Sequence, residues 1–204
     1  MSSFNVISSI GETTLKIRRS TFTGWVSYCS SVGEMKALLS QREELHSRAT
    51  HNCWAYIVGD SGETSHYSDC GEPSGSAGRP MYNSLLSNNL TNVVAVVTRY
   101  YGGVKLGVRG LIDAYGEAVD AALAATTVKK FVIYRHYKIT IPYPVLDTFW
   151  FTAKKHECEE VSADYGASVS LEVQLPVSNF ESFELYLTTL KASSDVNYQI
   201  VDAV

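Results

Sequence analysis

Two glycine-rich segments hold the residues whose types and spacing could bind an anion. The first, residues 68–80, runs into a predicted helix, and its candidate ligand-binding residues are Gly71, Gly75, Ser76, Gly78 and Arg79. Glycines allow close backbone approach, and the first N–H groups of a helix are unpaired at the positive end of its dipole. We therefore expect an anion site here, although the spacing matches neither a P-loop nor a dinucleotide-binding fingerprint. A tight crossing from strand to helix that needs small residues is the alternative.

The second segment, residues 99–110, lies between an apolar strand and a long helix. Its candidates are Arg99, Tyr100, Tyr101, Gly102, Gly103, Lys105, Gly107 and Arg109. The cations could surround an anion, and the tyrosine rings could stack on a base or on arginine. Ligands favour the carboxyl ends of strands in α/β sheets, so we expect both segments to share one cleft. The alternative is a surface loop with solvated cations and packed rings.

Four residues are candidates for acid–base chemistry. His51 could be a general base or a hydrogen-bonded structural histidine, and the structural role is favoured. Asp69 and Glu72 could activate water or bind a metal, but helix capping or turn formation is the favoured reading. Asp113 lies early in its helix, where a carboxylate is favourable for structural reasons alone. We therefore favour a binding role over catalysis.

The cysteines give no sign of nucleophilic or metal chemistry. The pair His51 and Cys53 has no third member, and the Cys and His spacings match no common zinc site. No C-x-x-C pair occurs among Cys29, Cys53, Cys70 and Cys158. We expect buried thiols that behave as small apolar side chains, and neither a metal nor a cofactor.

The composition is that of a globular protein. Of 204 residues, 45% are hydrophobic and 19% charged, and the net charge is −4. A strongly basic nucleic-acid binder is therefore not indicated, and any phosphate-binding surface must be local. The chain starts with no basic region followed by an apolar run, and no stretch approaches 18 apolar residues. We expect a cytoplasmic protein that does not bind a membrane.

The elements that position the two segments are read from apolar periodicity. In the first half we predict strands at 14–17, 22–26, 51–58 and 93–98, with helices at about 31–46, 81–88 and 107–126. The strand at 93–98 is apolar and β-branched throughout, which is typical of a central strand buried on both faces.

The second half has a βαββαβ pattern. Strands are predicted at 131–141, 159–165, 168–175 and 196–201, with helices after Pro144 and after Ser178 or Asn179. This is the size and order of a ferredoxin-like domain. We place the domains at 1–130 and 131–204, an α+β fold class. The first carries 12 basic and 11 acidic residues, net +1, and the second 5 and 10, net −5, which argues against the second as an independent RNA binder.

At the two segments the sequence resembles the IMPACT/YigZ family. The motifs that carry the resemblance are HNCWAY at 51–56, SDCGEPSGSAGRP at 68–80, TNVV at 91–94 and RYYGGVKLG at 99–107, in the family's order. The match covers most of residues 15–125 and is much weaker beyond. The resemblance implies a first domain with the fold of the second domain of a small-subunit ribosomal protein. It implies a second, ferredoxin-like domain similar to one in elongation factor G.

The resemblance also implies a role connected with translation. Eukaryotic members compete for the activator of a stress kinase, whereas bacterial members have no settled activity. No segment here resembles the RWD domain of eukaryotic members, so that interaction is not carried over. Four positions depart from the family pattern. Cys70 replaces a second aspartate, Thr21 an arginine, Arg109 a small residue and Asp113 a basic one.

Three hypotheses follow. The favoured one is a binding or regulatory protein linked to translation, with an anion cleft for nucleic acid or phosphate in the first domain and RNA, the ribosome or a translation-related protein as partner. The second is an enzyme that acts on a small phosphorylated ligand or nucleotide, with His51, Asp69 or Glu72 as acid–base groups. The third is a scaffold whose tyrosine-rich surface binds a protein.

Overall fold

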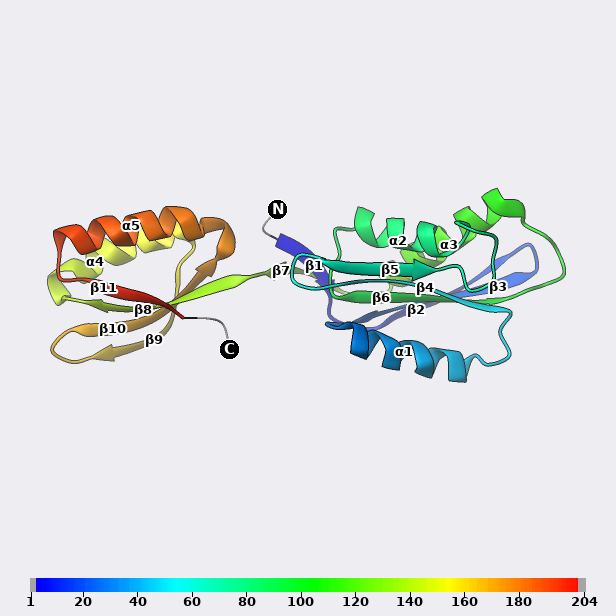
Figure 1. Ribbon diagram of the computed structural model, residues 1–204, viewed down its shortest axis with the longest axis horizontal. Helices are drawn as coiled ribbons and strands as arrows, with labels where there is room; N and C mark the ends of the chain where they lie inside the picture. The colour runs from blue at the N-terminus through cyan, green and yellow to red at the C-terminus, as the bar shows by residue number, and fades with distance from the viewer. Residues whose placement is uncertain (1–2, 202–204) are drawn as a thin grey trace. The chain divides into compact units, whose positions relative to one another are not determined.

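The computed structural model describes residues 3–201 and contains two compact units (Figure 1). The first comprises Phe4–Phe131, and the second begins at Val132. The change of unit falls inside strand β7 (Val128–Val132), which pairs with β1 (Ser3–Ile7) in a two-stranded sheet. The sequence pattern indicated neither strand as a separate element.

The first unit is built on a five-stranded sheet. Its strand order is β2 (Gly11–Ile17), β3 (Ser20–Tyr28), β6 (Val93–Tyr100), β4 (His51–Val58), β5 (Thr64–Ser68). Every neighbouring pair is antiparallel. Four of these strands were predicted, and β6 is indeed buried along seven of its eight residues. β5 was missed because its residues are mostly exposed and polar, so it has no apolar alternation.

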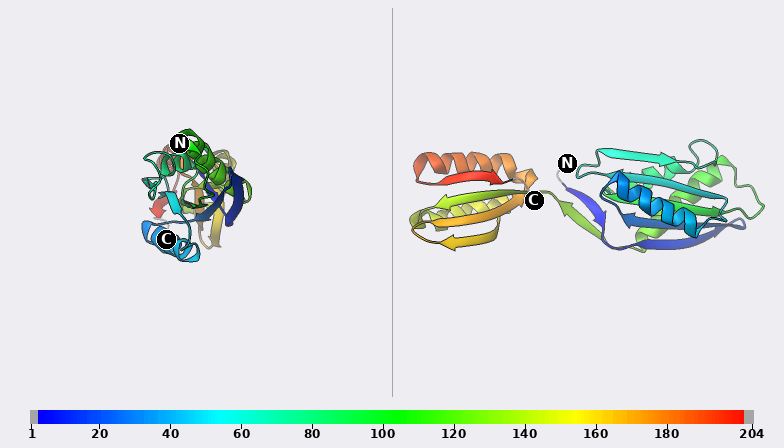
Figure 2. Two further views of the ribbon diagram at one scale, coloured as in Figure 1. Left: turned by 90° about the vertical axis from the view of Figure 1, so that its right-hand side faces the viewer. Right: turned by 60° about the horizontal axis from the view of Figure 1, so that its bottom comes forward.

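Helices cover both faces of this sheet (Figures 1 and 2). Helix α1 (Val32–Leu45) packs on one face, where Met35 contacts a cluster that includes Trp25 and Val96. Helices α2 (Gly78–Ser87) and α3 (Gly107–Ala124) cover the other face and supply Met81, Leu85, Tyr115 and Val119 to the larger core. Burial on both faces explains why β6 is apolar throughout, as the sequence indicated.

The second unit has the predicted βαββαβ order. Its elements are β8 (Tyr134–Ile141), α4 (Tyr143–Ala153), η1 (Lys154–His156), β9 (Glu159–Tyr165), β10 (Val169–Pro176), η2 (Val177–Asn179), α5 (Phe180–Ser193) and β11 (Asn197–Val201). The antiparallel sheet has the order β11-β8-β10-β9, and both helices lie on one face of it (Figure 1). Alternate residues such as Ile139 and Leu171 point into a core with Phe149 and Phe183. Period-2 alternation with one buried face is why these strands could be predicted.

Candidate functional site

The register of the first sheet brings the two glycine-rich segments together. His51 at the start of β4 pairs with Arg99 near the end of β6, and Thr21 at the start of β3 pairs with Tyr100. The sheet is antiparallel, so the rule that ligands gather at the carboxyl ends of parallel strands does not locate this site. The pairing itself does, because the start of β4 pairs on one side with the end of β6, where the second segment begins, and on the other with the end of β5, where the first segment begins.

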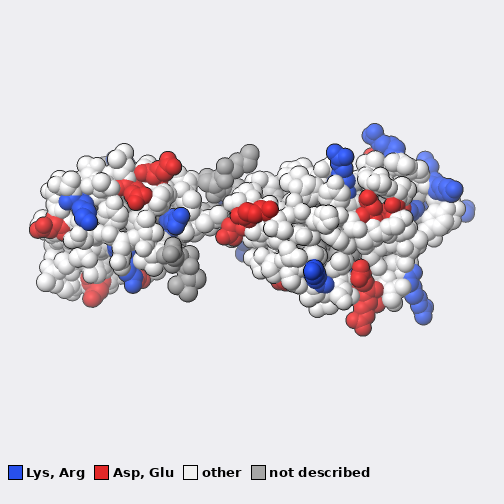
Figure 3. Space-filling view, viewed as in Figure 1, with Lys and Arg blue, Asp and Glu red and all other residues white. Residues whose placement is uncertain are grey.

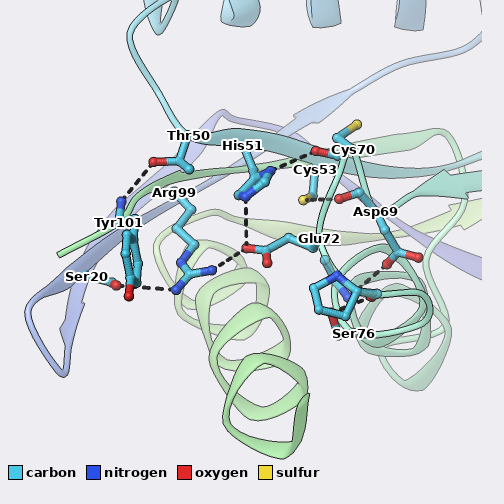
Figure 4. A network of polar contacts seen from close by, with 12 residues as sticks. Ser20, Thr50, His51, Cys53, Asp69, Cys70, Glu72, Ser76, Arg99 and Tyr101 are labelled. Atoms are coloured by element: carbon cyan, nitrogen blue, oxygen red, sulfur yellow. Dashed lines mark hydrogen bonds and ion pairs between the residues drawn. The ribbon is translucent and has the colours of Figure 1, made fainter. Parts of the chain in front are cut away.

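Glu72, from the first segment, is the centre of a buried polar cluster (Figure 4). Its Oε1 atom accepts a hydrogen bond of 2.6 Å from Arg99 Nη1 and one of 2.8 Å from the Tyr115 hydroxyl. The side chains of Glu72 and Arg99 are only 3% and 6% exposed. A buried carboxylate persists only when it is paired and hydrogen-bonded, so this pair ties the two segments together.

Arg99 is held on several sides. Its guanidinium lies 5.3 Å from the ring centres of both Phe22 and Tyr101, and Nη2 is 3.5 Å from Ser20 Oγ. The Nε atom is buried and has no hydrogen-bond partner among the residues that the structure describes. Arg99 is thus a fixed charge with one N–H group left unused, rather than the solvated cation of the alternative reading.

The ring of His51 is oriented by the backbone of the first segment. Its Nδ1 atom lies 2.9 Å from the carbonyl oxygen of Cys70. A carbonyl can only accept, so Nδ1 carries the hydrogen and donates it. The other nitrogen, Nε2, lies 3.9 Å from Glu72 Oε1 and bears no hydrogen in the neutral ring. His51 is therefore the hydrogen-bonded histidine that the sequence favoured.

Asp69 occupies the helix N-terminus where we expected an anion. Its carboxylate accepts hydrogen bonds of 2.8–2.9 Å from the N–H groups of Gly75, Ala77 and Gly78. Ala77 is the N-cap residue of α2 and Gly78 its first residue, so the protein supplies its own anion there. This is the capping role that the sequence favoured for Asp69. Glu72, for which capping was also favoured, binds Arg99 instead.

The residues around Asp69 fix the shape of the first segment. Gly71 and Gly75 have φ angles of +88° and +74°, which other residues rarely adopt. A Cβ atom on Gly78 would lie 2.8 Å from the backbone of Ser68, so the chain crosses itself there with no spare room. Ser76 is buried and donates its hydroxyl to the carbonyl of Pro73. These residues shape the loop. They fit the alternative given for this segment, a tight crossing from strand to helix that needs small residues.

A pocket of about 460 Å³ opens beside the Glu72–Arg99 pair. Its lining consists of Thr50, His51, Glu72, Pro73, Arg99, Tyr101, Lys105, Leu106, Gly107, Val108 and Leu111. Helix α3 begins in this wall, with Leu106 at its N-cap position. No side chain caps it and its first turn has no acidic residue. Unlike the start of α2, this helix N-terminus has no anion supplied by the described residues.

Some of the predicted site residues line the pocket, some shape the first segment, and others lie elsewhere. Those in the pocket wall are His51, Glu72, Arg99, Tyr101, Lys105 and Gly107. Those that build the first segment are Asp69, Gly71, Gly75, Ser76 and Gly78, and Arg79 is exposed at the start of α2. Tyr100 contacts His46 through its hydroxyl at 3.1 Å. Arg109 pairs with Asp113 and lines a neighbouring pocket of about 450 Å³.

Gly102 and Gly103 determine the backbone conformation of the second segment. A Cβ atom on Gly102 would meet the carbonyl oxygen of Arg19 at 1.9 Å, so the segment lies against the turn between β2 and β3. Gly103 has a φ of +83° and open space around it.

Sequence reasoning missed several contributors to the site. Tyr115 lies inside the helix predicted at 107–126 and was not among the candidate site residues, yet its hydroxyl donates to Glu72 at 2.8 Å. Thr50 accepts from the N–H of Tyr101, and Ser20 accepts from the N–H of Gly102. A pattern of apolar residues reveals which face a helix buries but not which hydroxyl meets a carboxylate, and the hydroxyl residues lie in segments remote in sequence.

The thiol beside this cluster is not a nucleophile. Cys53 is fully buried, and its single S–H lies between two acceptors, the carbonyl of Asp69 at 3.0 Å from Sγ and the Tyr115 hydroxyl oxygen at 3.3 Å. Burial raises the pKa of Cys53 far above its ordinary value, so the thiolate does not form near neutral pH. Burial likewise raises the pKa of Tyr115, whose hydroxyl stays protonated and donates to Glu72.

The described residues, 3–201, contain no group of three or more His, Cys, Asp or Glu side chains placed to hold a metal ion. Across the same part of the chain, no helix is long and apolar enough to cross a membrane.

Comparison with known proteins identifies the family. The Impact N-terminal domain matches residues 18–123. "IMPACT family member YigZ" of Escherichia coli (strain K12) is 32% identical over 181 residues, 88% of this chain and 89% of the relative. "IMPACT family member YvyE" of Bacillus subtilis (strain 168) is 32% identical over 200 residues, 95% and 90% of the two chains. A crystal structure of a hypothetical protein has a TM-score of 0.64 at 29% identity and covers 100% of this chain and 98% of its own. The chain therefore belongs to the IMPACT family.

Proposed function

We propose that the first unit is a binding module, with a regulatory role connected with translation, whose pocket takes a phosphate or similar anionic group at the N-terminus of α3. One observation carries this proposal. The 18-residue helix α3 starts, uncapped, in the wall of a pocket beside Lys105 and Arg99. Unpaired N–H groups and the helix dipole favour an anion there. The guanidinium of Arg99 adds a fixed positive charge to the same wall.

The charges in the pocket wall support an anionic ligand. Glu72 and Arg99 neutralise each other through their 2.6 Å ion pair. Lys105 is exposed and makes no ion pair with any residue of the described chain. Apart from His51, the wall therefore carries one excess positive charge in addition to the helix dipole.

The remaining wall is apolar and supports a ligand with a non-polar part. Pro73, Leu106, Val108 and Leu111 line it together with the ring of Tyr101. The volume of about 460 Å³ lies in the range of small-molecule sites. A mononucleotide, whose base is flat and apolar on its faces and whose phosphate is charged, meets both requirements.

The proposed connection with translation rests on membership of the IMPACT family. We further propose that the second unit is ferredoxin-like, supported by its βαββαβ order and its strand order β11-β8-β10-β9. The proposal that the first unit shares the fold of a ribosomal-protein domain rests on the family resemblance alone.

An enzyme that acts on a small phosphorylated ligand or nucleotide is the second candidate. The observation that favours it is the orientation of His51, which lines the pocket with its Nδ1–H fixed by the Cys70 carbonyl and its Nε2 3.9 Å from Glu72 Oε1. A histidine held in this way can transfer a proton. Asp69 does not contribute to this candidate, because Oδ1 accepts from the N–H groups of Ala77 and Gly78 and Oδ2 from that of Gly75.

Isothermal titration calorimetry with inorganic phosphate, AMP and ATP tests the proposal. We expect binding to wild type, weaker binding to Lys105→Ala, and unchanged binding to Lys129→Ala, which removes a matched exposed lysine from β7. Absence of binding by all three probes would contradict the anion pocket and favour a protein partner. Turnover of a bound nucleotide that is lost in His51→Gln would establish the enzyme instead.

A further inference from the structure

The turn between β2 and β3 presents two consecutive arginines in a backbone conformation that arginine disfavours. Ile17 and Ser20 pair across the turn, which leaves Arg18 and Arg19 as its two central residues. Their φ angles are +43° and +68°. Two-residue hairpin turns with positive φ strongly favour Asn-Gly or Gly-Gly. Backbone strain of this kind concentrates at functional positions, so the charges at this turn call for an explanation.

The turn is held against the second glycine-rich segment. The N–H of Gly102 donates to Ser20 Oγ at 3.2 Å, and a Cβ on Gly102 would overlap the Arg19 carbonyl. Arg18 shares the wall of the neighbouring pocket with Leu106 and Arg109. Leu106 also lines the anion pocket, so the pocket that Arg18 lines and the anion pocket share a wall residue.

The side chains along this edge are available to a partner. Arg18, Arg19 and Lys105 are exposed and make no ion pair with any described residue. Arg109 pairs with Asp113, but its side chain is 89% exposed. Tyr101 lines the pocket together with Lys105 and is 44% exposed, and Tyr100, which contacts His46, is 37% exposed. Lys and Arg side chains gather at the end of this unit in Figure 3, at the right-hand side of the view.

We call the set Arg18, Arg19, Lys105, Arg109, Tyr100 and Tyr101 the cationic edge. Four positive charges face two acidic neighbours, Asp113 and Glu117, which line the pocket beside Arg109. The excess is therefore +2 within a unit whose own net charge is only +1 over residues 1–130. Charge is concentrated at this edge although the whole chain is acidic.

We propose that the cationic edge binds the backbone of a single-stranded nucleic acid, with one phosphate in the α3 pocket and neighbouring phosphates on Arg18 and Arg19. This inference rests on the proposed function and extends it from one anionic group to a chain of them. A small phosphate in the pocket leaves the turn arginines without a role, whereas a strand passes both. The exposed tyrosines favour a single strand, because aromatic side chains stack on unpaired bases.

The test compares oligonucleotides of increasing length. Fluorescence anisotropy with fluorescein-labelled oligouridylates of about 2, 4, 8 and 12 nucleotides, at several salt concentrations, measures affinity and its salt dependence. The main variant is R18N/R19G, which removes two charges and supplies the residues that the turn favours, so it retains the fold. The matched control is K129S/K130S, which removes two exposed lysines from β7.

We expect wild-type affinity to rise from two to eight nucleotides. In R18N/R19G the slope of log affinity against log salt should fall by about 1.4, or about 0.7 for each lost phosphate contact, and the rise with length should disappear. K129S/K130S should behave as wild type. AMP binding, measured by calorimetry, should be unchanged in R18N/R19G.

Three results would overturn the inference. An unchanged salt slope in R18N/R19G would show that the turn arginines do not contact phosphates. Affinity independent of length, with AMP binding intact, would show a small-ligand site and leave the proposed function standing. Binding of poly-glutamate, but not of any oligonucleotide, that is lost in R18N/R19G would show an acidic protein segment as the partner. Absence of AMP binding to wild type would contradict the pocket, whereas R18N/R19G alters no residue of the pocket wall and tests the edge alone, so failure of the two proposals can be told apart.

Discussion

The two glycine-rich segments look alike in sequence but present their helices differently. Each contains glycines with positive φ and runs into a helix of the same layer, α2 or α3. At α2 the first N–H groups bind Asp69, whereas at α3 no side chain caps the helix and a pocket opens. Glycines before a helix thus indicate a tight approach. A nearby carboxylate decides whether the helix N-terminus is occupied by the protein or open to a ligand.

Glu72 connects the two segments, and its pairing with Arg99 gives the largest expected effect. Arg99→Met leaves the Glu72 carboxylate buried without its cation. We expect the free energy of unfolding to fall by about 3–5 kcal/mol, measured by urea denaturation. Arg109→Met breaks an exposed pair and should change it by less than about 0.5 kcal/mol. Adding Glu72→Gln to Arg99→Met should restore part of the loss. A loss below about 1 kcal/mol for Arg99→Met would mean that the pair does not join the segments.

Asp69→Ala tests the N-terminus of α2, which Asp69 occupies. It removes the acceptor for three N–H groups, and we expect the free energy of unfolding to fall by about 2–3 kcal/mol. The emptied start of α2 should then bind phosphate, so added phosphate should raise the melting temperature of this variant more than that of wild type. An equal phosphate effect in both proteins would show that capping by Asp69 is not what closes this site.

R18N/R19G tests the turn against which the second segment lies. Asn and Gly adopt positive φ at less cost than arginine, so we expect the free energy of unfolding to rise by about 1–2 kcal/mol in urea denaturation. R18K/R19K keeps both charges and the strained backbone and should leave stability unchanged. A less stable R18N/R19G would mean that the arginine side chains stabilise the fold, which would remove the reason to assign them to a partner.

Val108→Glu places a carboxylate at the N-terminus of α3, as Asp69 does at the N-terminus of α2. Val108 is 54% exposed in the first turn of α3, where a carboxylate favours the helix dipole. The free energy of unfolding should rise by about 0.3–1 kcal/mol, while AMP binding should weaken roughly tenfold, equal to about 1.4 kcal/mol. In Val108→Gln the new side chain is as large as glutamate but uncharged, so this variant should bind AMP nearly as wild type does. Equal AMP binding by the Glu and Gln variants would place the phosphate elsewhere.

The helices and strands were predictable where a buried face makes apolar residues recur at a regular spacing. Strand β6 and helix α3 show it most clearly, as do β8 and β10 in the second unit. The misses are short strands without that signal. β5 is largely exposed, and the pairing of β1 with β7 joins segments at the two ends of the first unit. Periodicity reports which residues one element buries, not which remote segments pair.

The candidate site was predictable in its residue types more than in their roles. Residue chemistry indicated His51, Arg99 and Lys105, which now line one pocket. It could not reveal that Arg99 is neutralised by Glu72, because this contact spans 27 residues and depends on how a loop folds. The hydroxyl of Tyr115 was hidden for a similar reason, since its ring occupies a core position of α3.

The most direct test of the open and closed helix starts is a titration of the ¹⁵N-labelled protein with inorganic phosphate, followed by amide NMR signals. We predict saturable shifts for the N–H groups of Gly107, Val108 and Arg109, at the start of α3, and none for Ala77 and Gly78, which already bind Asp69. Shifts at Ala77 and Gly78, or none at the start of α3, would contradict the account.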